Sequence, residues 1–166
     1  MRFGKKGVEM QTFSFIFVLV LMALILGYGI RSFMSVKTIS DDVGLGDFVF
    51  HLRDEVDALF SFEVGSSKHV TFLLAPAVER VCFYNGDEPI TTSPLDPTLK
   101  LHLEANPDDN IFVMPFTFAQ NTFSLEHLRA GQENPLCFLT KGKLQSRLET
   151  VLGDDGTVYV EIQRIA

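Results

Sequence analysis

The sequence has few basic side chains beyond its first residues. Its 166 residues contain 14 Lys and Arg against 21 Asp and Glu, for a net charge of −7. Residues 1–30 carry +2, so residues 31–166 carry −9. Proteins that bind nucleic acid contact phosphates through clustered Lys and Arg. This acidic composition excludes nucleic acid as a partner.

The sequence also lacks the common catalytic motifs. It has no G-x-S-x-G elbow, Walker A loop, G-x-G-x-x-G fingerprint, H-E-x-x-H helix or C-x-x-C pair. Ser66, Ser67 and Lys68 contain a nucleophile and a base but have no neighbours that would orient them. The four histidines lack the spacing of metal ligands: His51, His69, His102 and His127. We therefore predict no enzymatic activity, no cofactor and no metal, and an anchored hydrolase lacks a catalytic constellation.

Pairs of neighbouring acidic residues could bind a cation. Three such pairs occur, at residues 41–42, 108–109 and 154–155. Carboxylate oxygens can bind calcium, but the sequence has no EF-hand register of ligands. Asp next to Gly, or within an Asn-Pro-Asp cluster, is typical of turns. We interpret these pairs as turns.

Charge is absent from a long stretch near the N-terminus. Thr12–Ile30 has 19 residues without a charged side chain and is mostly apolar. A helix of that length is on the order of 28 Å long, which matches the hydrocarbon core of a bilayer. The run is longer than the apolar core of a cleaved secretory signal. It predicts a retained transmembrane helix.

The charges that flank this run predict its orientation. Arg2, Lys5 and Lys6 precede it, whereas the basic residues that follow it are soon met by Asp41 and Asp42. The positive-inside bias favours a cytoplasmic N-terminus and an extracytoplasmic C-terminal domain.

Cysteine is scarce. Cys82 and Cys137 each lie in a predicted strand, 55 residues apart. In an exported domain, two cysteines suggest one disulfide. The alternative is a pair of free, buried thiols that act as small apolar groups.

The pattern that follows the apolar run predicts an amphipathic helix. Gly44 and Gly46 suit a helix end or a hinge. The next apolar residues recur at steps of three and four: Leu45, Phe48, Val49, Leu52, Val56, Leu59 and Phe60. Such spacing is typical of a helix that packs one face on a core.

The pattern of the remaining residues predicts short strands separated by turns. Residues 69–75, 78–84, 99–105 and 111–119 are the predicted strands, with Pro115 at an edge or a bulge. Residues 144–162 alternate apolar and polar side chains on both sides of a Gly-Asp-Asp-Gly turn, which predicts a β-hairpin. The predicted class is α+β. It has a basic leader (1–7), a long N-terminal transmembrane helix with its extension (8–43), an amphipathic helix (44–62) and a small, mainly antiparallel β domain (63–166).

The start of the chain resembles a known signal. Lys5-Lys6-Gly7 ahead of an apolar helix is similar to the class III, prepilin-type signal of archaeal type IV pilins. Bacterial pilins carry Phe first and Glu fifth after the cut, whereas this chain would have Val8 first and Thr12 fifth. The resemblance implies that a prepilin-type peptidase cuts between Gly7 and Val8.

More of the chain fits the same picture. An acidic amphipathic helix, Gly-Ser-Ser-Lys at 65–68, Val81-Cys82-Phe83 and Cys137-Phe138 resemble small archaeal membrane-anchored proteins, most of them uncharacterised and some pilin-like. Pilins of this family pack their N-terminal helices into a filament core and expose their β domains.

The resemblance implies a non-enzymatic structural subunit of a surface filament or envelope assembly. Its partners would be membrane lipid, copies of itself or other pilin-like subunits, and the peptidase. Glu9 would pair with the new α-amine at Val8 of a neighbouring subunit, or else lie at the membrane edge. The alternative is a single-pass anchored binding module that forms no filament. The predicted location is accordingly a single-pass membrane protein or a surface filament.

Overall fold

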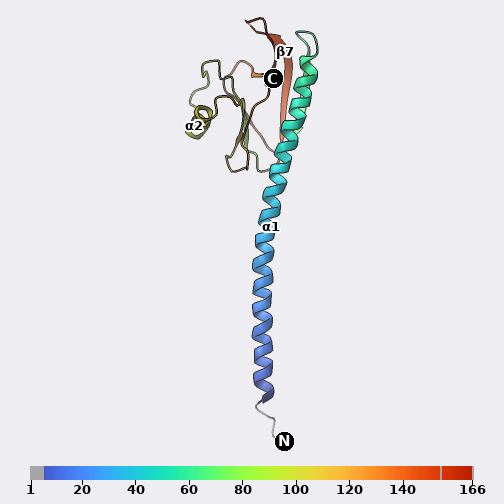
Figure 1. The fold of residues 1–166 in the computed structure, drawn as a ribbon, viewed down its shortest axis with the longest axis vertical. Helices are drawn as coiled ribbons and strands as arrows, with labels where there is room; N and C mark the ends of the chain where they lie inside the picture. Colours follow the sequence, from blue (N-terminus) through green and yellow to red (C-terminus); the bar gives the residue numbers. More distant parts are fainter. Residues whose placement is uncertain (1–5, 154, 166) are drawn as a thin grey trace. The chain divides into compact units, whose positions relative to one another are not determined.

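The chain forms two compact units, Met1–Ile39 and Ser40–Ala166. The computed structural model describes the backbone of residues 6–153 and 155–165, and the side chains of residues 13–29, 43–153 and 155–165. Helix α1 (Lys6–Phe60) belongs in part to each unit (Figure 1).

The part of α1 that belongs to the second unit has the buried stripe that the sequence predicts. Its buried side chains are Leu45, Phe48, Val49, Leu52, Val56 and Leu59. No helix end or hinge interrupts α1 at Gly44 or Gly46, contrary to expectation. A glycine costs a helix about 1 kcal/mol relative to alanine. Burial of Leu45 and Phe48 beside these glycines outweighs that cost, because tertiary packing supplies most helical stability in proteins.

The prediction of a transmembrane helix is wrong. No helix in the described part of the chain has both the length and the apolar composition needed to cross a membrane. The apolar side chains described in the first unit occupy residues 13–29. The predicted single-pass membrane location is contradicted by the same finding.

Sheet A has the strand order β1-β7-β8-β5. Its neighbours pair antiparallel, except that β5 and β8 are parallel. The hairpin predicted over 144–162 is confirmed, since β7 and β8 pair from Arg147↔Gln163 to Leu152↔Val158. The strand bounds are Ser67–Leu73 for β1, Leu128–Ala130 for β5, Lys143–Leu152 for β7 and Val158–Gln163 for β8.

Sheet B has the strand order β4-β3-β2-β6 and is antiparallel throughout. The strand bounds are Arg80–Phe83 for β2, Ile111–Met114 for β3, Thr122–Phe123 for β4 and Leu136–Leu139 for β6.

Residues 99–105, which the alternating pattern predicts as a strand, instead belong to helix α2 (Pro97–Ala105). The Asp96 side chain accepts a hydrogen bond from the Thr98 N–H, and Pro97 occupies the first turn. Both features start a helix. Leu99 and Leu103 are buried while Leu101 is 65% exposed, because residues four apart share one helical face.

One core joins α1 and both sheets. The Phe48 and Phe72 ring centroids lie 5.5 Å apart, and the Thr150 Oγ1 on β7 donates to the Leu59 carbonyl of α1 at 3.0 Å. The other face of sheet B forms a smaller cluster with α2, made of Cys82, Leu99, Leu103 and Phe112. Sheet B is therefore covered on both faces.

Candidate functional site

The largest unexplained feature is an apolar surface on α1, here called the apolar segment and defined as residues 13–29. Its large apolar side chains are between 42% and 78% exposed. They are Phe13, Phe15, Ile16, Phe17, Val18, Leu19, Val20, Leu21, Met22, Leu24, Ile25, Leu26 and Tyr28.

The apolar segment has no polar face. Residues 15–22 are all apolar and exposed, and a helix turns about 100° per residue, so these eight positions cover its whole circumference. A helix that is apolar all round is a buried helix. Exposed apolar surface on this scale marks an interaction site.

The residues predicted for processing and assembly, Gly7, Val8 and Glu9, lie outside the residues whose side chains are described.

The predicted disulfide between Cys82 and Cys137 is confirmed. These cysteines face each other directly in the β2–β6 pairing. Cys82 is fully buried in the smaller cluster with Leu99, Leu103 and Phe112. The bond therefore links an inner strand of sheet B to its edge strand β6.

The histidines make ordinary contacts. His51 Nε2 lies 3.5 Å from Asp47 Oδ1 on the solvent side of α1. His102 stacks on Phe116, and His127 stacks on Phe60. Across the described residues, no three His, Cys, Asp or Glu side chains come together as a metal site.

The remaining reactive side chains are held by structural partners. Lys68 Nζ forms an ion pair with Glu55 Oε2 at 2.6 Å, and Ser67 Oγ accepts from Arg147 at 3.2 Å. Asp155 accepts hydrogen bonds from the Thr157 N–H and the Tyr159 hydroxyl, which lower its pKa from the ordinary value of 3.8. Asp155 thus acts as a turn residue.

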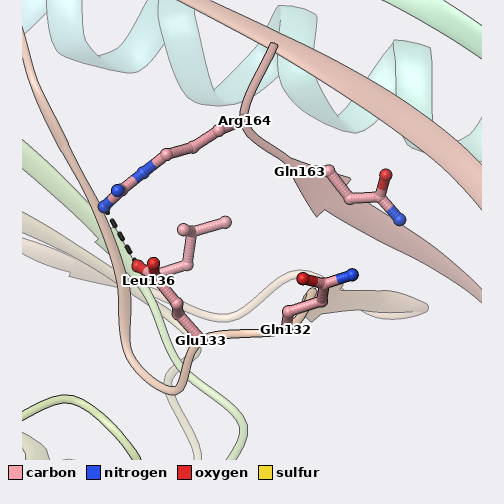
Figure 2. Close-up of a pocket in the computed structure, with 5 residues that line it drawn as sticks. All are labelled: Gln132, Glu133, Leu136, Gln163 and Arg164. Carbon is pink, nitrogen blue, oxygen red and sulfur yellow. Dashed lines mark ion pairs between the residues drawn. The ribbon is translucent and has the colours of Figure 1, made fainter. Parts of the chain in front are cut away.

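A shallow hollow of about 180 Å³ lies between the end of β8 and β6. Figure 2 shows Arg164 directed across it to Glu133, with which it forms an ion pair at 3.0 Å. Its guanidinium also donates to the Cys137 carbonyl at 2.9 Å. Gln132, Leu136 and Gln163 complete the lining, which holds a closed ion pair and no nucleophile.

Comparisons with protein-family models, with curated proteins and with solved structures found no match to this chain. The apolar segment is therefore the feature on which a functional argument rests.

Proposed function

We propose that this chain is a non-enzymatic, pilin-like structural subunit. It assembles with copies of itself, or with similar subunits, through the apolar segment of α1, and leaves its acidic β domain exposed. The disulfide supports assembly in an oxidising, extracellular environment, where such bonds persist.

The observation that carries this proposal is the exposure of the apolar segment on every side. One partner helix would cover a single face, so several neighbours are needed to remove the whole surface from water. Copies of the same helix provide matched apolar surface around a common axis. Burial of each Leu or Phe side chain contributes roughly 1.5–3 kcal/mol. The summed burial free energy of these side chains therefore exceeds the free-energy cost of association, which is about 4–15 kcal/mol.

The resemblance to prepilin-type signals adds a processing step to the proposal. A prepilin-type peptidase would cut the Gly7–Val8 bond and retain the helix that follows. In the assembly, the Glu9 carboxylate would pair with the Val8 α-amine of a neighbouring subunit. Such a pair would order the subunits along the assembly axis.

The test compares two exposed leucines. Leu26 lies in the apolar segment and is 66% exposed, and Leu101 lies on α2 and is 65% exposed. The wild-type chain and L101E should form large particles in sedimentation velocity and ordered assemblies in negative-stain electron microscopy. L26E should sediment as a monomer, because a carboxylate in an apolar contact costs several kcal/mol when it is buried unpaired.

Far-UV circular dichroism controls for folding of the three proteins. A wild-type chain that stays monomeric would contradict the proposal. Equal assembly by L26E and the wild type would contradict it as well.

A further inference from the structure

Asn85 lies at a junction between the two sheets. It follows β2 of sheet B, and its side chain bonds to β5 at the edge of sheet A. Asn85 Oδ1 accepts from the Ala130 N–H at 2.7 Å, and Asn85 Nδ2 donates to the Ala130 carbonyl at 3.1 Å. Strand β8 bonds the neighbouring His127 carbonyl and Gly131 N–H instead. The Asn85 amide therefore pairs with β5 as the main chain of another strand would.

The main chain of Asn85 is held by a second asparagine. The Asn85 N–H donates to Asn134 Oδ1 at 2.9 Å, and the Asn85 carbonyl accepts from Asn134 Nδ2 at 2.9 Å. Both residues are buried, with 6% of Asn85 and 2% of Asn134 exposed. Side chain and main chain of Asn85 are thus fixed together, and only an amide, with a donor and an acceptor, satisfies both groups of Ala130.

The residue after Asn85 makes its amide chemically reactive. In a flexible chain, the main-chain nitrogen of the next residue loses its proton and attacks the asparagine Cγ, and ammonia leaves from that carbon. Water then opens the five-membered succinimide to aspartate or isoaspartate, so that one water is consumed and one ammonia released. Attack is least hindered from a glycine, which has no Cβ. Gly86 is the only glycine that follows an asparagine in this sequence.

The folded structure opposes this reaction at the Asn85 amide. Within the described part of the chain, the Gly86 N–H makes no hydrogen bond, so the attacking group itself is not protected. Attack would make Cγ tetrahedral and turn Oδ1 and Nδ2 away from the Ala130 main chain. The buried N–H and carbonyl of Ala130 would then lose their partners, which is costly. The barrier to succinimide formation is therefore higher in the folded chain.

Neither product of the reaction fits the junction. Aspartate at position 85 has no N–H for the Ala130 carbonyl and places a buried carboxylate beside it. Isoaspartate adds one carbon to the main chain, and so displaces the N–H and carbonyl that pair with Asn134. A converted chain therefore lacks the contacts that link β2 to β5.

Protection of Asn85 depends on contacts with distant residues. Ala130 follows Asn85 by 45 residues and Asn134 follows it by 49. Pairings between distant residues form slowly, so local structure around the turn does not protect the amide. Asn85 remains reactive until β5 and the segment after it have reached their native positions.

We propose that Asn85–Gly86 is a spontaneous modification site that folding closes. A chain that folds keeps Asn85. A chain that stays unfolded is converted to aspartate or isoaspartate at this position and no longer forms the junction between the two sheets. The reaction therefore removes slowly folding chains from the pool that reaches the native β domain.

The test follows each asparagine by peptide mapping and mass spectrometry. The full-length protein is kept at mildly alkaline pH, either in buffer or unfolded in guanidinium chloride. In guanidinium chloride Asn85 should convert, Gly86→Ala should slow its conversion several-fold, and Asn106 and Asn134 should persist because proline follows each of them. In buffer Asn85 should convert at least about tenfold more slowly, since the unfolded fraction of a native protein is on the order of 10⁻³ or less.

A pair of variants assigns the protection to this junction. Asn134→Ala removes the partner of the Asn85 main chain and should speed conversion of Asn85 in buffer roughly tenfold, as expected when buried main-chain groups lose their partner. Asn121→Ala is the matched control, because the Asn121 side chain bonds the Phe118 main chain in the same way, away from Asn85. Asn121→Ala should leave the rate in buffer unchanged, and all three proteins should convert equally in guanidinium chloride.

Refolding tests the consequence of conversion. After partial conversion and dilution from guanidinium chloride, brief trypsin digestion should destroy chains converted at Asn85 and spare those that retain it. Equal survival of the two kinds of chain would overturn the proposal. So would a rate in buffer within tenfold of the rate in guanidinium chloride, or equal rates in buffer for Asn134→Ala and Asn121→Ala. The wild-type comparisons decide the matter even if Asn134→Ala does not fold.

Discussion

Ser146 and Thr150 show at the scale of single residues how the contact between α1 and sheet A is made. Both lie on the inner face of β7, and both are fully buried. The Thr150 hydroxyl donates to the Leu59 carbonyl at 3.0 Å. The Ser146 hydroxyl has no hydrogen-bond partner among the described residues.

This difference predicts opposite effects for two similar substitutions. Ser146→Ala should raise the free energy of unfolding by about 1 kcal/mol, because it removes a buried hydroxyl without a partner. Thr150→Val should lower it by about 1 kcal/mol, because it removes a hydrogen bond that is made. Urea unfolding followed by circular dichroism measures both. Destabilisation by Ser146→Ala would show that its hydroxyl has a partner.

Asp155 is a second residue with a measurable consequence. Hydrogen bonds from the Thr157 N–H and the Tyr159 hydroxyl favour the charged carboxylate and lower its pKa below 3.8. A carboxyl whose pKa is lower in the folded state stabilises the fold above its unfolded pKa. That contribution is lost as the pH falls through the folded pKa.

Asp155→Asn should therefore be less stable than the wild type at pH 7, and the difference should shrink as the pH falls below about 4. The urea midpoints of both proteins between pH 7 and pH 2 provide the measurement. A difference that stays constant with pH would mean that the carboxylate charge does not contribute. Asp87→Asn, on another exposed turn, provides a matched control.

At the scale of elements, the sequence predicts those parts of the fold that depend on local pattern. The buried stripe over 45–60 and the hairpin over 144–162 follow from side-chain period alone. The structure of residues 99–105 does not follow from side-chain period. Leucines at every second position also include pairs four residues apart, so the same pattern fits a strand and a helix. Only the Asp96 cap and Pro97 distinguish the helix, and they precede the pattern.

The hydrogen bonds of Asn85 to the edge strand β5 could not be predicted from the sequence. Asn85 lies in an Asn-Gly-Asp turn, and turn chemistry is a sufficient reason for an asparagine there. Its role at β5 requires contact with Ala130, 45 residues later. No local pattern encodes that contact.

The disulfide supports a prediction about sheet B. Cys82 and Cys137 close a loop with a sequence separation of 55. Loop-closure entropy assigns such a bond about 4 kcal/mol. Reduction of the wild type should lower the free energy of unfolding by up to that amount.

Two measurements check this. Urea unfolding with and without reductant gives the difference in free energy, and peptide mapping without reductant should recover the Cys82–Cys137 pair. Quantitative alkylation of both thiols without reductant would contradict the bond. Comparison with the Cys82→Ala, Cys137→Ala double variant separates loss of the cross-link from loss of packing in the smaller cluster.

At the scale of the whole molecule, the proposed processing changes the charge balance. Cleavage after Gly7 removes Arg2, Lys5 and Lys6 and no acidic side chain, so the side-chain net charge falls from −7 to −10. If the bond is cut, mass spectrometry of protein from its native source should find Val8 at the N-terminus. Because three basic side chains are lost, the isoelectric point of the protein should also fall. An intact start at Met1 or Arg2 would contradict cleavage. It would leave the assembly proposal to the Leu26 test.

Pairing of β1 with β7 also sets an order of events during synthesis. Residues 67–73 must wait for residues 143–149 before sheet A can form, and Thr150 completes its contact with Leu59 only 91 residues after that carbonyl has been made. Pairings between distant residues form slowly. The apolar segment therefore leaves the ribosome well before the β domain can fold. During that interval the nascent chain presents its most aggregation-prone surface without a folded domain to keep neighbouring chains apart, so a cellular factor that binds apolar helices should engage it cotranslationally.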